Sequence, residues 1–337
     1  MDRIRVAIQG SGIIARYHAR ACSAAEGVEL VAAANWRPES LARLAEEWHI
    51  PRTTTDFDEL AADPNIDAVI ITLPNCLHKA ETLRMLRAGK HVLVEKPMAM
   101  NVAEAEEMIA AARQAQRVLM VGHMWRFDVE VNWLRRVVAQ GLLGEIVKTK
   151  GYHVNPAGVG PQGWFNDPAK SGGGVVMDMA VHSLDTTRFL LGEPLPVRVY
   201  AEVGTRYSSY KVEDDVTLMV HWDNGVYTTI VSSAWAPHQD EPEGAHEIWG
   251  TRGYGRLFPS RLHLPLADVA GALVPEFPPR HEQCDWPMYQ RQVEYLARCI
   301  REGLTPVPGG AEGLQTLKVV EAVYESARTG EAVRIHQ

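Results

Sequence analysis

The stretch that decides the fold is IRVAIQGSGIIA, residues 4–15, an apolar run that passes directly into a glycine turn. Gly10, Gly12 and Ala15 form a G-x-G-x-x-A pattern between this run and a helical pattern. The first glycine permits the tight turn, the second lets the backbone approach a pyrophosphate, and the small third residue lets helix and strand pack closely. A glycine turn alone can be purely structural, but its place after the first strand predicts a dinucleotide site, with the anion at the helix start.

Apolar runs and helical patterns alternate from this turn to residue 123. Strands are expected over residues 4–8, 28–34, 67–74, 91–97 and 117–123, and helices after Gly12 and over residues 37–48, 76–89 and 103–115. Strands that alternate with long helices indicate parallel βαβ units. Residues 1–123 are therefore predicted to form a Rossmann dinucleotide-binding domain of the α/β class, with a doubly wound parallel sheet.

The pattern changes in the rest of the chain, residues 124–337, which is predicted to form a second domain. A helix is expected over residues 131–141, strands over residues 144–154, 196–207, 214–222 and 225–235, and two closing helices over residues 288–303 and 313–330. Asn224 and Gly225 lie between two strand patterns, and an Asn-Gly step there is a strong hairpin signal. Hairpins indicate an antiparallel sheet, and the proline-rich stretch 264–287 is predicted to be an irregular loop.

Size, charge and cysteine content limit the possible functions. A chain of 337 residues suits two domains, and its formal charge of −8 argues against generic binding to nucleic acid or anionic membrane. No run approaches the roughly 18 apolar residues that a membrane span needs. The four cysteines lie far apart, and the 13 histidines are scattered without metal-binding spacing. A small-molecule partner, a cytoplasmic location and no metal site are therefore expected.

The run HVLVEKP, residues 91–97, places a charged pair at the end of an apolar strand. Ligands of an open α/β sheet bind beyond the carboxyl ends of its strands, so Lys96 is expected to point toward the cofactor crevice if HVLV is the fifth strand. A cis peptide bond between Lys96 and Pro97 is one way to hold the lysine in a defined orientation. The alternative is that Glu95 and Lys96 form a solvated turn.

A second constellation is SGGGVVMDMAVHSLD, residues 171–185. Three glycines end a loop and a helix begins, with Asp178 and His182 four residues apart and therefore on the same face, one turn above the other. A carboxylate next to an imidazole orients it and makes it a better proton acceptor. The alternative is a structural pair, in which the aspartate bonds backbone donors at the helix start and the histidine is bonded to it in the core.

The end of the second strand reads Asn35, Trp36, Arg37, where NAD-binding proteins usually place an acidic residue. A neutral amide does not repel a 2′-phosphate, Arg37 could pair with one, and Trp36 or Arg37 could stack on adenine. These residues favour NADP over NAD. The alternative is that Arg37 is solvated and Asn35 bonds the ribose of either cofactor.

Four segments together carry a family resemblance: GSGIIARYHA (10–19), TLPNCLHKAETLRMLRAGKHVLVEKPMAMNVAEA (72–105), PQGWFNDPAKSGGGVVMDMAVHSLDTTRFLLG (161–192) and VVEAVYESARTGEAV (319–333). The chain resembles the Gfo/Idh/MocA oxidoreductases over nearly its whole length. The resemblance implies a Rossmann domain, an α+β domain with a large, open, mainly antiparallel sheet, and an active site between them. It also implies hydride transfer between NAD(P) and a hydroxyl or carbonyl carbon of a sugar, sugar derivative or cyclitol, and homodimers or homotetramers assembled through the sheet.

The resemblance also implies roles for particular residues. Lys96 matches the family's active-site lysine, and Asp178 and His182 match its acid and its histidine. We expect His182 to remove the hydroxyl proton while Lys96 stabilises the alkoxide, although these two roles could be exchanged. The cofactor is expected to contact Gly10, Gly12, Ile13, Ile14, Asn35, Trp36, Arg37, Pro74, Asn75, His78, Glu95, Lys96 and Trp164. Polar groups around the cleft are expected to contact the substrate: Lys96, Arg126, His153, Asn155, Trp164, Asn166, Lys170, Asp178 and His182.

Two other functions are compatible with the same pattern. One is a redox-neutral glycosidase or lyase that keeps its nicotinamide bound and uses transient oxidation. The other is a non-catalytic sensor of the same fold, since a fold alone does not determine function. Loops over residues 156–167 and 238–246 are expected to set specificity, and the sequence does not identify the sugar or cyclitol.

Overall fold

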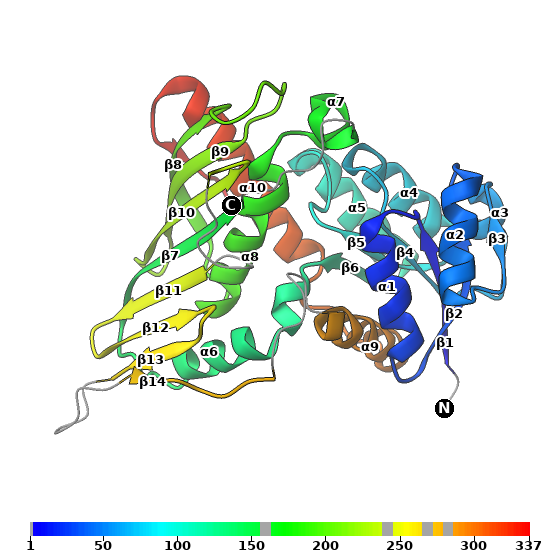
Figure 1. Cartoon of the computed structure of the whole chain (residues 1–337), viewed down its shortest axis with the longest axis horizontal. Coiled ribbons are helices and arrows are strands. Elements are labelled where there is room, and N and C mark those ends of the chain that lie inside the picture. Colours follow the sequence, from blue (N-terminus) through cyan, green and yellow to red (C-terminus); the bar gives the residue numbers. More distant parts are fainter. Residues whose placement is uncertain (1–2, 156–162, 238–244, 265–271, 279–285) are drawn as a thin grey trace. The chain divides into compact units, whose positions relative to one another are not determined.

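The computed structural model describes residues 3–155, 163–237, 245–264, 272–278 and 286–337 (Figure 1). The chain forms two compact units: Met1–Phe127 with Asp285–Leu314, and Asp128–Cys284 with Gln315–Gln337. The N-terminal part of the first unit thus ends close to the expected boundary at residue 123. The arrangement differs from the expectation of a continuous second domain, because a segment near the C-terminus belongs to the first unit.

The first unit is built on a parallel sheet that has, among the described residues, six strands in the order β3-β2-β1-β4-β5-β6. They are β1 (Ile4–Gln9), β2 (Val28–Ala34), β3 (Thr53–Thr54), β4 (Ala68–Ile71), β5 (His91–Glu95) and β6 (Leu119–Gly122). This is the strand order of a doubly wound Rossmann sheet. The chain adds strands toward one edge of the sheet from β1 to β3 and toward the other edge from β4 to β6, so the order switches between β1 and β4. The predicted fold class of this part is confirmed.

Helices flank this sheet. They are α1 (Ile13–Ala24), α2 (Pro38–Trp48), α3 (Phe57–Ala62), α4 (Asn75–Arg87), α5 (Val102–Ala115), the 3₁₀ turn η1 (Met124–Phe127) and α9 (Trp286–Glu302). All residues of β4 are buried, as expected for a central parallel strand covered on both faces. The sequence patterns do not reveal β3 and α3, because elements this short show no clear periodicity.

Helix α9 completes the first unit by packing on α1. Tyr289 is buried, and its ring stacks on Tyr17 with 5.3 Å between centroids and meets the edge of the His18 ring at 5.1 Å. Val293 and Leu296, further along the same helix, are fully buried as well. Burial of this apolar face explains why residues so late in the chain return to the N-terminal unit.

The second unit is built on a mixed sheet with the order β14-β13-β12-β11-β7-β10-β9-β8-β15 among the described residues. The strands are β7 (Ile146–Asn155), β8 (Pro196–Gly204), β9 (Asp215–Trp222), β10 (Tyr227–Ala234), β11 (Ala245–Gly250), β12 (Gly253–Leu257), β13 (Arg261–His263), β14 (Ala272–Leu273) and β15 (Val333–Arg334). Strands β7 and β10 are parallel, and the other neighbours are antiparallel. The predicted hairpin joins β9 and β10, with Gly225 at a φ of 84°. A mainly antiparallel sheet is thus confirmed.

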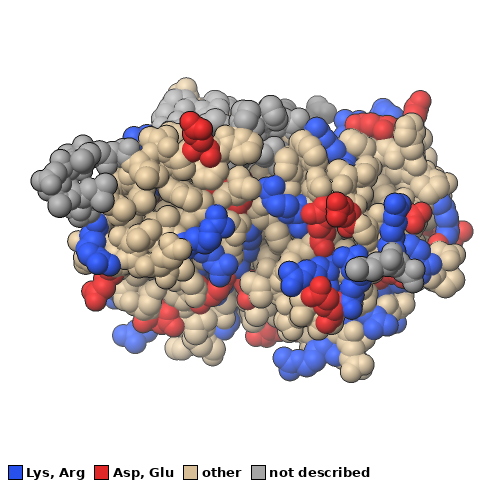
Figure 2. Space-filling model, turned by 90° about the horizontal axis from the view of Figure 1, so that it is seen from below, with Lys and Arg blue, Asp and Glu red and all other residues tan. Residues whose placement is uncertain are grey.

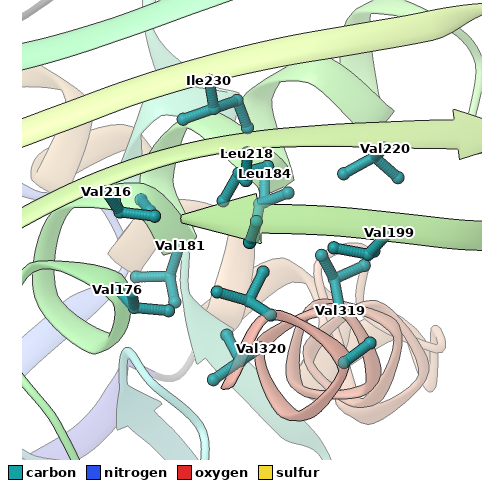
Figure 3. Packing of buried hydrophobic residues seen from close by; sticks show 14 of the residues in the cluster. Val176, Val181, Leu184, Val199, Val216, Leu218, Val220, Ile230, Val319 and Val320 are labelled. Atoms are coloured by element: carbon teal, nitrogen blue, oxygen red, sulfur yellow. The ribbon is translucent and has the colours of Figure 1, made fainter. Parts of the chain in front are cut away.

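Helices cover one side of this sheet in Figure 1. They are α6 (Val129–Ala139), the π-helix η3 (Val176–Ala180), α8 (Val181–Leu190) and α10 (Gly310–Thr329), which begins in the first unit. The short elements η2 (Trp164–Asn166) and α7 (Pro168–Ser171) precede η3 in the chain. Figure 3 shows the core beneath them, where Leu184 of α8 and Val319 of α10 meet strand residues such as Leu218. Alternate residues of the strands point into this core. The residues between them point to the other side of the sheet, away from the core.

Charged side chains of both signs are interspersed on the face shown in Figure 2. Lys and Arg side chains lie between Asp and Glu side chains there, so this face carries no continuous basic stripe. No helix in the described part of the chain is long and apolar enough to cross a membrane.

Candidate functional site

The glycine turn lies where the strand order of the Rossmann sheet reverses. Gly10 follows β1 with a φ of 120°, and its N–H donates to the carbonyl oxygen of Ala34 at 2.8 Å. A Cβ atom at this position would lie 2.3 Å from Oγ1 of Thr72, which follows β4. Glycine is therefore required both by the backbone conformation and by the close approach of the two strand ends.

The start of α1 fits an anionic ligand. Gly12 is the N-cap residue and makes no side-chain capping hydrogen bond, and a Cβ atom placed on it would meet none of the described atoms within 4 Å. Ile13, the first residue of the helix, is 74% exposed. Backbone N–H groups and the positive end of the helix dipole attract a phosphate at such a start. Ile14 lies one position further, so the predicted pyrophosphate residues gather at one place with room beside them.

The end of β2 carries a polar cluster. Asn35 is buried, and its Nδ2 donates to Oγ of Ser11 and, at 3.1 Å, to Oγ of Ser40. The two serine hydroxyls are 2.7 Å apart. Ser11 belongs to the glycine turn, so the cluster joins that turn to the end of β2. The two serines were not predicted, although Ser11 stands between the two glycines of the motif.

Trp36 and Arg37 are exposed beyond this cluster. The Trp36 ring meets Phe57 edge-on, with 6.1 Å between the centroids, so one edge of the indole is supported by protein. The carbonyl oxygen of Arg37 accepts a hydrogen bond from Ser40 at 3.1 Å. An exposed aromatic face suits stacking on a base, and an exposed guanidinium suits pairing with a phosphate.

Glu95, at the end of β5, is buried rather than solvated. Its Oε1 lies 2.7 Å from Nε2 of His18, a fully buried residue of α1. Its Oε2 accepts the backbone N–H of Lys96 at 3.1 Å. Gly122 on β6 makes room for this carboxylate, since a Cβ atom there would lie 2.8 Å from Cδ of Glu95. The carboxylate therefore links the helix of the glycine turn to the backbone of Lys96.

His78 holds the backbone on the far side of Lys96. The Lys96–Pro97 peptide bond is cis, as the sequence suggested. Nδ1 of the buried His78 lies 2.8 Å from the carbonyl oxygen of Pro97, and Nε2 lies 2.9 Å from that of Leu73. Burial lowers the pKa of His78 below its usual value, and the two carbonyl oxygens act in the opposite direction. The residue thus ties the loop after β4 to the turn after β5.

Asp178 and His182 lie where the helix type changes. Asp178 belongs to the π-helix η3, and His182 is the second residue of α8. Hydrogen bonds in a π-helix run between residues five apart, so the backbone between these two residues departs from a regular α-helix. That the two side chains share one face stays a prediction. π-helical segments occur frequently at functional sites, which agrees with an active role for this stretch.

Three histidines of the second unit gather near the start of α8. The rings of His153 and His182 have 6.0 Å between their centroids. Nε2 of the buried His246 on β11 lies 3.5 Å from the carbonyl oxygen of Ser183, and burial lowers the pKa of His246 to about 4, with His153 contributing. Gly151 allows strand β7 to lie close to helix α8, since a Cβ atom there would lie 3.1 Å from Cβ of Ser183. Sequence reasoning missed His246 as a part of this cluster.

The remaining predicted residues lie at several places. Pro74 and Asn75 open α4 on the carboxyl side of the Rossmann sheet, and Arg126 is buried in η1. Asn155 ends β7, Asn166 ends η2, and the Trp164 ring stacks on Phe165 with 3.8 Å between centroids. Lys170 pairs with Asp167 at 2.8 Å and lowers the pKa of that carboxyl group.

The predicted catalytic residues divide between the two units. Lys96 belongs to the first unit, whereas Asp178 and His182 belong to the second, so their convergence on one reacting carbon stays a prediction. Residues 156–162 and 238–244 of the expected specificity loops lie outside the described residues. Within the described residues, no three His, Cys, Asp or Glu side chains are grouped so as to hold a metal ion.

Two family models match most of the sequence. Residues 4–123 match the model described as "Oxidoreductase family, NAD-binding Rossmann fold". Residues 131–256 match the model described as "GFO/IDH/MocA C-terminal domain". The first match covers the glycine turn and Lys96, and the second covers Asp178 and His182.

Similar sequences and solved structures support the same family. The sequence is 30% identical over 331 residues to 1,5-anhydro-D-fructose reductase of Ensifer adhaerens, covering 97% of each chain. The aldose-aldose oxidoreductase of Caulobacter crescentus, solved in complex with glycerol, superimposes with a TM-score of 0.88 at 31% identity, covering 99% of this chain and 100% of the other. A levoglucosan dehydrogenase in complex with NADH shares the fold, with a TM-score of 0.92 at 23% identity over 100% of both chains.

Proposed function

The chain belongs to the Gfo/Idh/MocA family of oxidoreductases, and we propose that it transfers a hydride between NAD(P) and a hydroxyl or carbonyl carbon of a sugar, sugar derivative or cyclitol. It is an oxidoreductase of a sugar- and cyclitol-dehydrogenase family with an NAD(P)-binding Rossmann domain. The relatives are named reductases and dehydrogenases, which favours net hydride transfer over a redox-neutral lyase or a sensor.

The proposed mechanism assigns one task to each of three side chains. A nicotinamide cofactor held at the glycine turn of Gly10 and Gly12 would supply or take up the hydride. His182 removes the proton from the substrate hydroxyl during oxidation and returns it during reduction. Lys96 donates a hydrogen bond to the same oxygen and stabilises its negative charge, and Asp178 orients the imidazole. A lysine side chain presents hydrogen-bond donors, which suits Lys96 to charge stabilisation better than to proton removal.

The observation that carries this proposal is the anchoring of Lys96. Its backbone N–H donates to Glu95, and the same carboxylate is bonded to His18 on the helix that follows the glycine turn. A lysine needed only for solubility requires no such buried support. The support instead suits an ammonium that must be held in a fixed position relative to a dinucleotide at the start of α1.

The direct test is a substrate panel followed by nicotinamide absorbance with NAD and with NADP. The panel contains 1,5-anhydro-D-fructose, aldoses, levoglucosan and several cyclitols. On the best substrate, Lys96→Ala is expected to lower kcat/KM by about 10²- to 10³-fold, because a charge-stabilising donor is lost. Lys79→Ala, which removes a surface lysine of the same unit, serves as the control. Near-normal turnover of Lys96→Ala would refute the assignment.

We further propose that the cluster at Asn35 admits NADP and favours it over NAD. The buried amide and the hydroxyls of Ser11 and Ser40 occupy the place of the usual carboxylate, and Arg37 lies exposed beside them. Arg37→Ala is expected to weaken NADP binding at least tenfold and NAD binding little, since a charged hydrogen bond to a phosphate is worth about 1.5–3 kcal/mol. Equal losses for both cofactors would contradict this preference.

Assembly and location are proposed on separate grounds. Tyr200 and Met219 are paired across β8 and β9 on the side of the sheet away from its core, and both are exposed. This surface suits a second copy of the chain, in a homodimer or homotetramer. Within the described residues, no disulfide joins Cys22, Cys76 and Cys299, which suits the reducing cytoplasm.

A further inference from the structure

The helix start that carries Asp178 has no cap from its own N-terminal residue. Val175 precedes the π-helix η3 and makes no side-chain capping hydrogen bond. Val175 and Val176 are both buried, so water cannot readily satisfy the backbone N–H groups there. Buried N–H groups at a helix start need acceptors, and leaving them without one costs stability. The acceptors must therefore come from another part of the unit.

Glu213 supplies them from the connection between β8 and β9. Its Oε1 accepts the N–H of Gly174 at 2.7 Å and the N–H of Val176 at 3.1 Å. Its own carbonyl oxygen accepts the N–H of Val175 at 3.0 Å. Three successive backbone donors at the helix start are thus bound by one residue that is distant in the sequence.

Tyr324 on α10 holds the Glu213 carboxylate in place. Its hydroxyl donates to the same Oε1 at 2.8 Å. Burial raises the pKa of Glu213, whereas the bonds from Tyr324 and from the backbone amides favour the charged form. Burial and the adjacent Glu213 raise the pKa of Tyr324 well above 10, so its hydroxyl stays a donor.

Gly173 and Gly174 let Tyr324 and Glu213 lie close to the backbone at the helix start. A Cβ atom on Gly173 would lie 1.8 Å from the hydroxyl oxygen of Tyr324. A Cβ atom on Gly174 would lie 1.8 Å from the carbonyl oxygen of Glu213. Side chains larger than hydrogen would push both residues away from the helix start. The glycines before Asp178 are thus explained by contact with Glu213 and Tyr324.

We propose that Glu213, supported by Tyr324, is a positioning residue that fixes the helix start bearing Asp178 and His182, and this inference rests on the function proposed above. The backbone N–H of Asp178 donates to the carbonyl oxygen of Gly174 at 3.0 Å, so a shift of Gly174 moves Asp178. His182 follows four residues later in the same continuous helix. Reacting groups displaced by about 1 Å lose about 10²-fold in rate, so the clamp acts on kcat.

Two matched pairs of variants test the clamp in the full-length protein. Glu213→Ala removes the acceptor, whereas Glu213→Gln keeps a side-chain oxygen at the same place. Tyr324→Phe removes one hydroxyl from α10, whereas Ser326→Ala removes another, which accepts from Ala201 and donates to Glu331 instead. Three quantities are measured for each: kcat on the best panel substrate, the cofactor Kd, and amide hydrogen exchange of residues 174–182.

Glu213→Ala is expected to lower kcat by about 10- to 100-fold with an unchanged cofactor Kd, and to speed exchange of residues 174–182. Tyr324→Phe should do the same more weakly, while Glu213→Gln stays within about threefold of the wild type because its oxygen still accepts these bonds. Ser326→Ala should leave both kcat and this exchange unchanged. Unaltered exchange in Glu213→Ala, or a kcat equal to that of the wild type despite faster exchange, would overturn the inference.

A failure of the proposed function gives a different result. If the wild type turns over no member of the panel, the dehydrogenase assignment fails. The histidine Cε1–H resonance of His182 then replaces kcat as the readout, together with the exchange of residues 174–182. A shifted resonance in Glu213→Ala and an unshifted one in Glu213→Gln support the clamp, and identical resonances in all variants refute it.

Discussion

His18 serves two parts of the Rossmann unit at once. It lies on the helix that begins at the glycine turn, and its Nε2 meets the carboxylate of Glu95 at 2.7 Å. The second oxygen of that carboxylate accepts the N–H of Lys96. The buried histidine thus connects the predicted pyrophosphate site with the predicted catalytic lysine through one carboxylate, which neither motif shows when it is considered alone.

Replacement of His18 should show the strength of this connection. His18→Leu is expected to destabilise the protein by about 1–3 kcal/mol, because one oxygen of the buried Glu95 carboxylate then lacks its partner. His18→Gln retains an N–H donor near the position of Nε2 and should recover most of this loss. Chemical unfolding of the two variants and of the wild type gives the comparison. Equal stability of the leucine and glutamine variants would contradict the role of the hydrogen bond.

His246 predicts a pH dependence of stability. Burial lowers its pKa to about 4 in the folded protein, from about 6.5 in the unfolded chain, so folding favours the neutral imidazole. This contribution is complete above pH 6.5 and is lost as the pH falls from 6.5 toward 4. At pH 5 the loss amounts to about 2 kcal/mol. His246→Gln should therefore lose less stability than the wild type between pH 7.5 and pH 5, as measured by thermal unfolding.

The sequence identifies the site residues that stand out from their neighbours and misses those that do not. Lys96 is conspicuous because it follows an apolar strand, and Asp178 because it follows three glycines. His18 lies three residues after Ala15 on the same helix, and both are buried, so the face of the helix gives a usable signal. Glu213 has no local signal, because its partners are Gly174 and Tyr324, far away in the chain.

At the scale of elements, the start of the helix that carries His182 departs from the regular pattern. The sequence predicts an α-helix after the glycines, and the structure contains the π-helix η3 before α8. A π-turn is set by which carbonyl each N–H reaches, and apolar periodicity in the sequence does not report this choice. Residues 174 to 176 are fixed instead by contacts with another connection of the unit.

Substitution of one glycine tests this account of the helix start. Gly174→Ala is expected to destabilise the protein by about 1–3 kcal/mol, because the new methyl group overlaps the backbone of Glu213 and forces it to move. Gly12→Ala is the matched control, since a Cβ atom there meets no described atom. The control should unfold at the wild-type temperature and yet bind NADP more weakly, because its methyl group enters the predicted pyrophosphate space. Equal melting temperatures of all three proteins would contradict the packing argument.

Most long elements are predicted well, but strands β11 and β12 were not predicted. The predicted helix over residues 37–48 corresponds to α2, and the hairpin at Asn224 and Gly225 is present. The two-residue strand β3 and the parallel pairing of β7 with β10 were not predicted. Strand pairing depends on which distant strands share a core, and no property of a single segment determines it.

At the scale of the whole molecule, the outward side of the second sheet is the surface proposed for assembly. Tyr200 and Met219 are 43% and 38% exposed and lie directly opposite each other on β8 and β9. Thr229 continues the same row on β10. Large exposed side chains that lie side by side, such as Tyr200 and Met219, suit a contact with another protein surface.

A single charge on this surface tests the proposed assembly. Met219→Glu is expected to convert the oligomer into monomers, because a carboxylate buried in an interface without a partner costs several kcal/mol. Light scattering after size-exclusion chromatography measures the mass. Leu142→Glu, at an exposed leucine outside the strands, is the control and should keep the wild-type mass. An unchanged mass for Met219→Glu would place the interface elsewhere.

Because α9 packs in the N-terminal unit, it affects the order in which the two units can fold during synthesis. Its Tyr289 covers Tyr17 and His18, so the nucleotide-binding half cannot finish packing until Leu314 has left the ribosome. Domains usually fold one after another as they emerge. Here a nascent chain that has completed strands β7 to β14 of the second sheet still exposes the apolar surface of α1 and offers it to chaperones. A stop codon before Trp286 therefore harms the half of the protein made first.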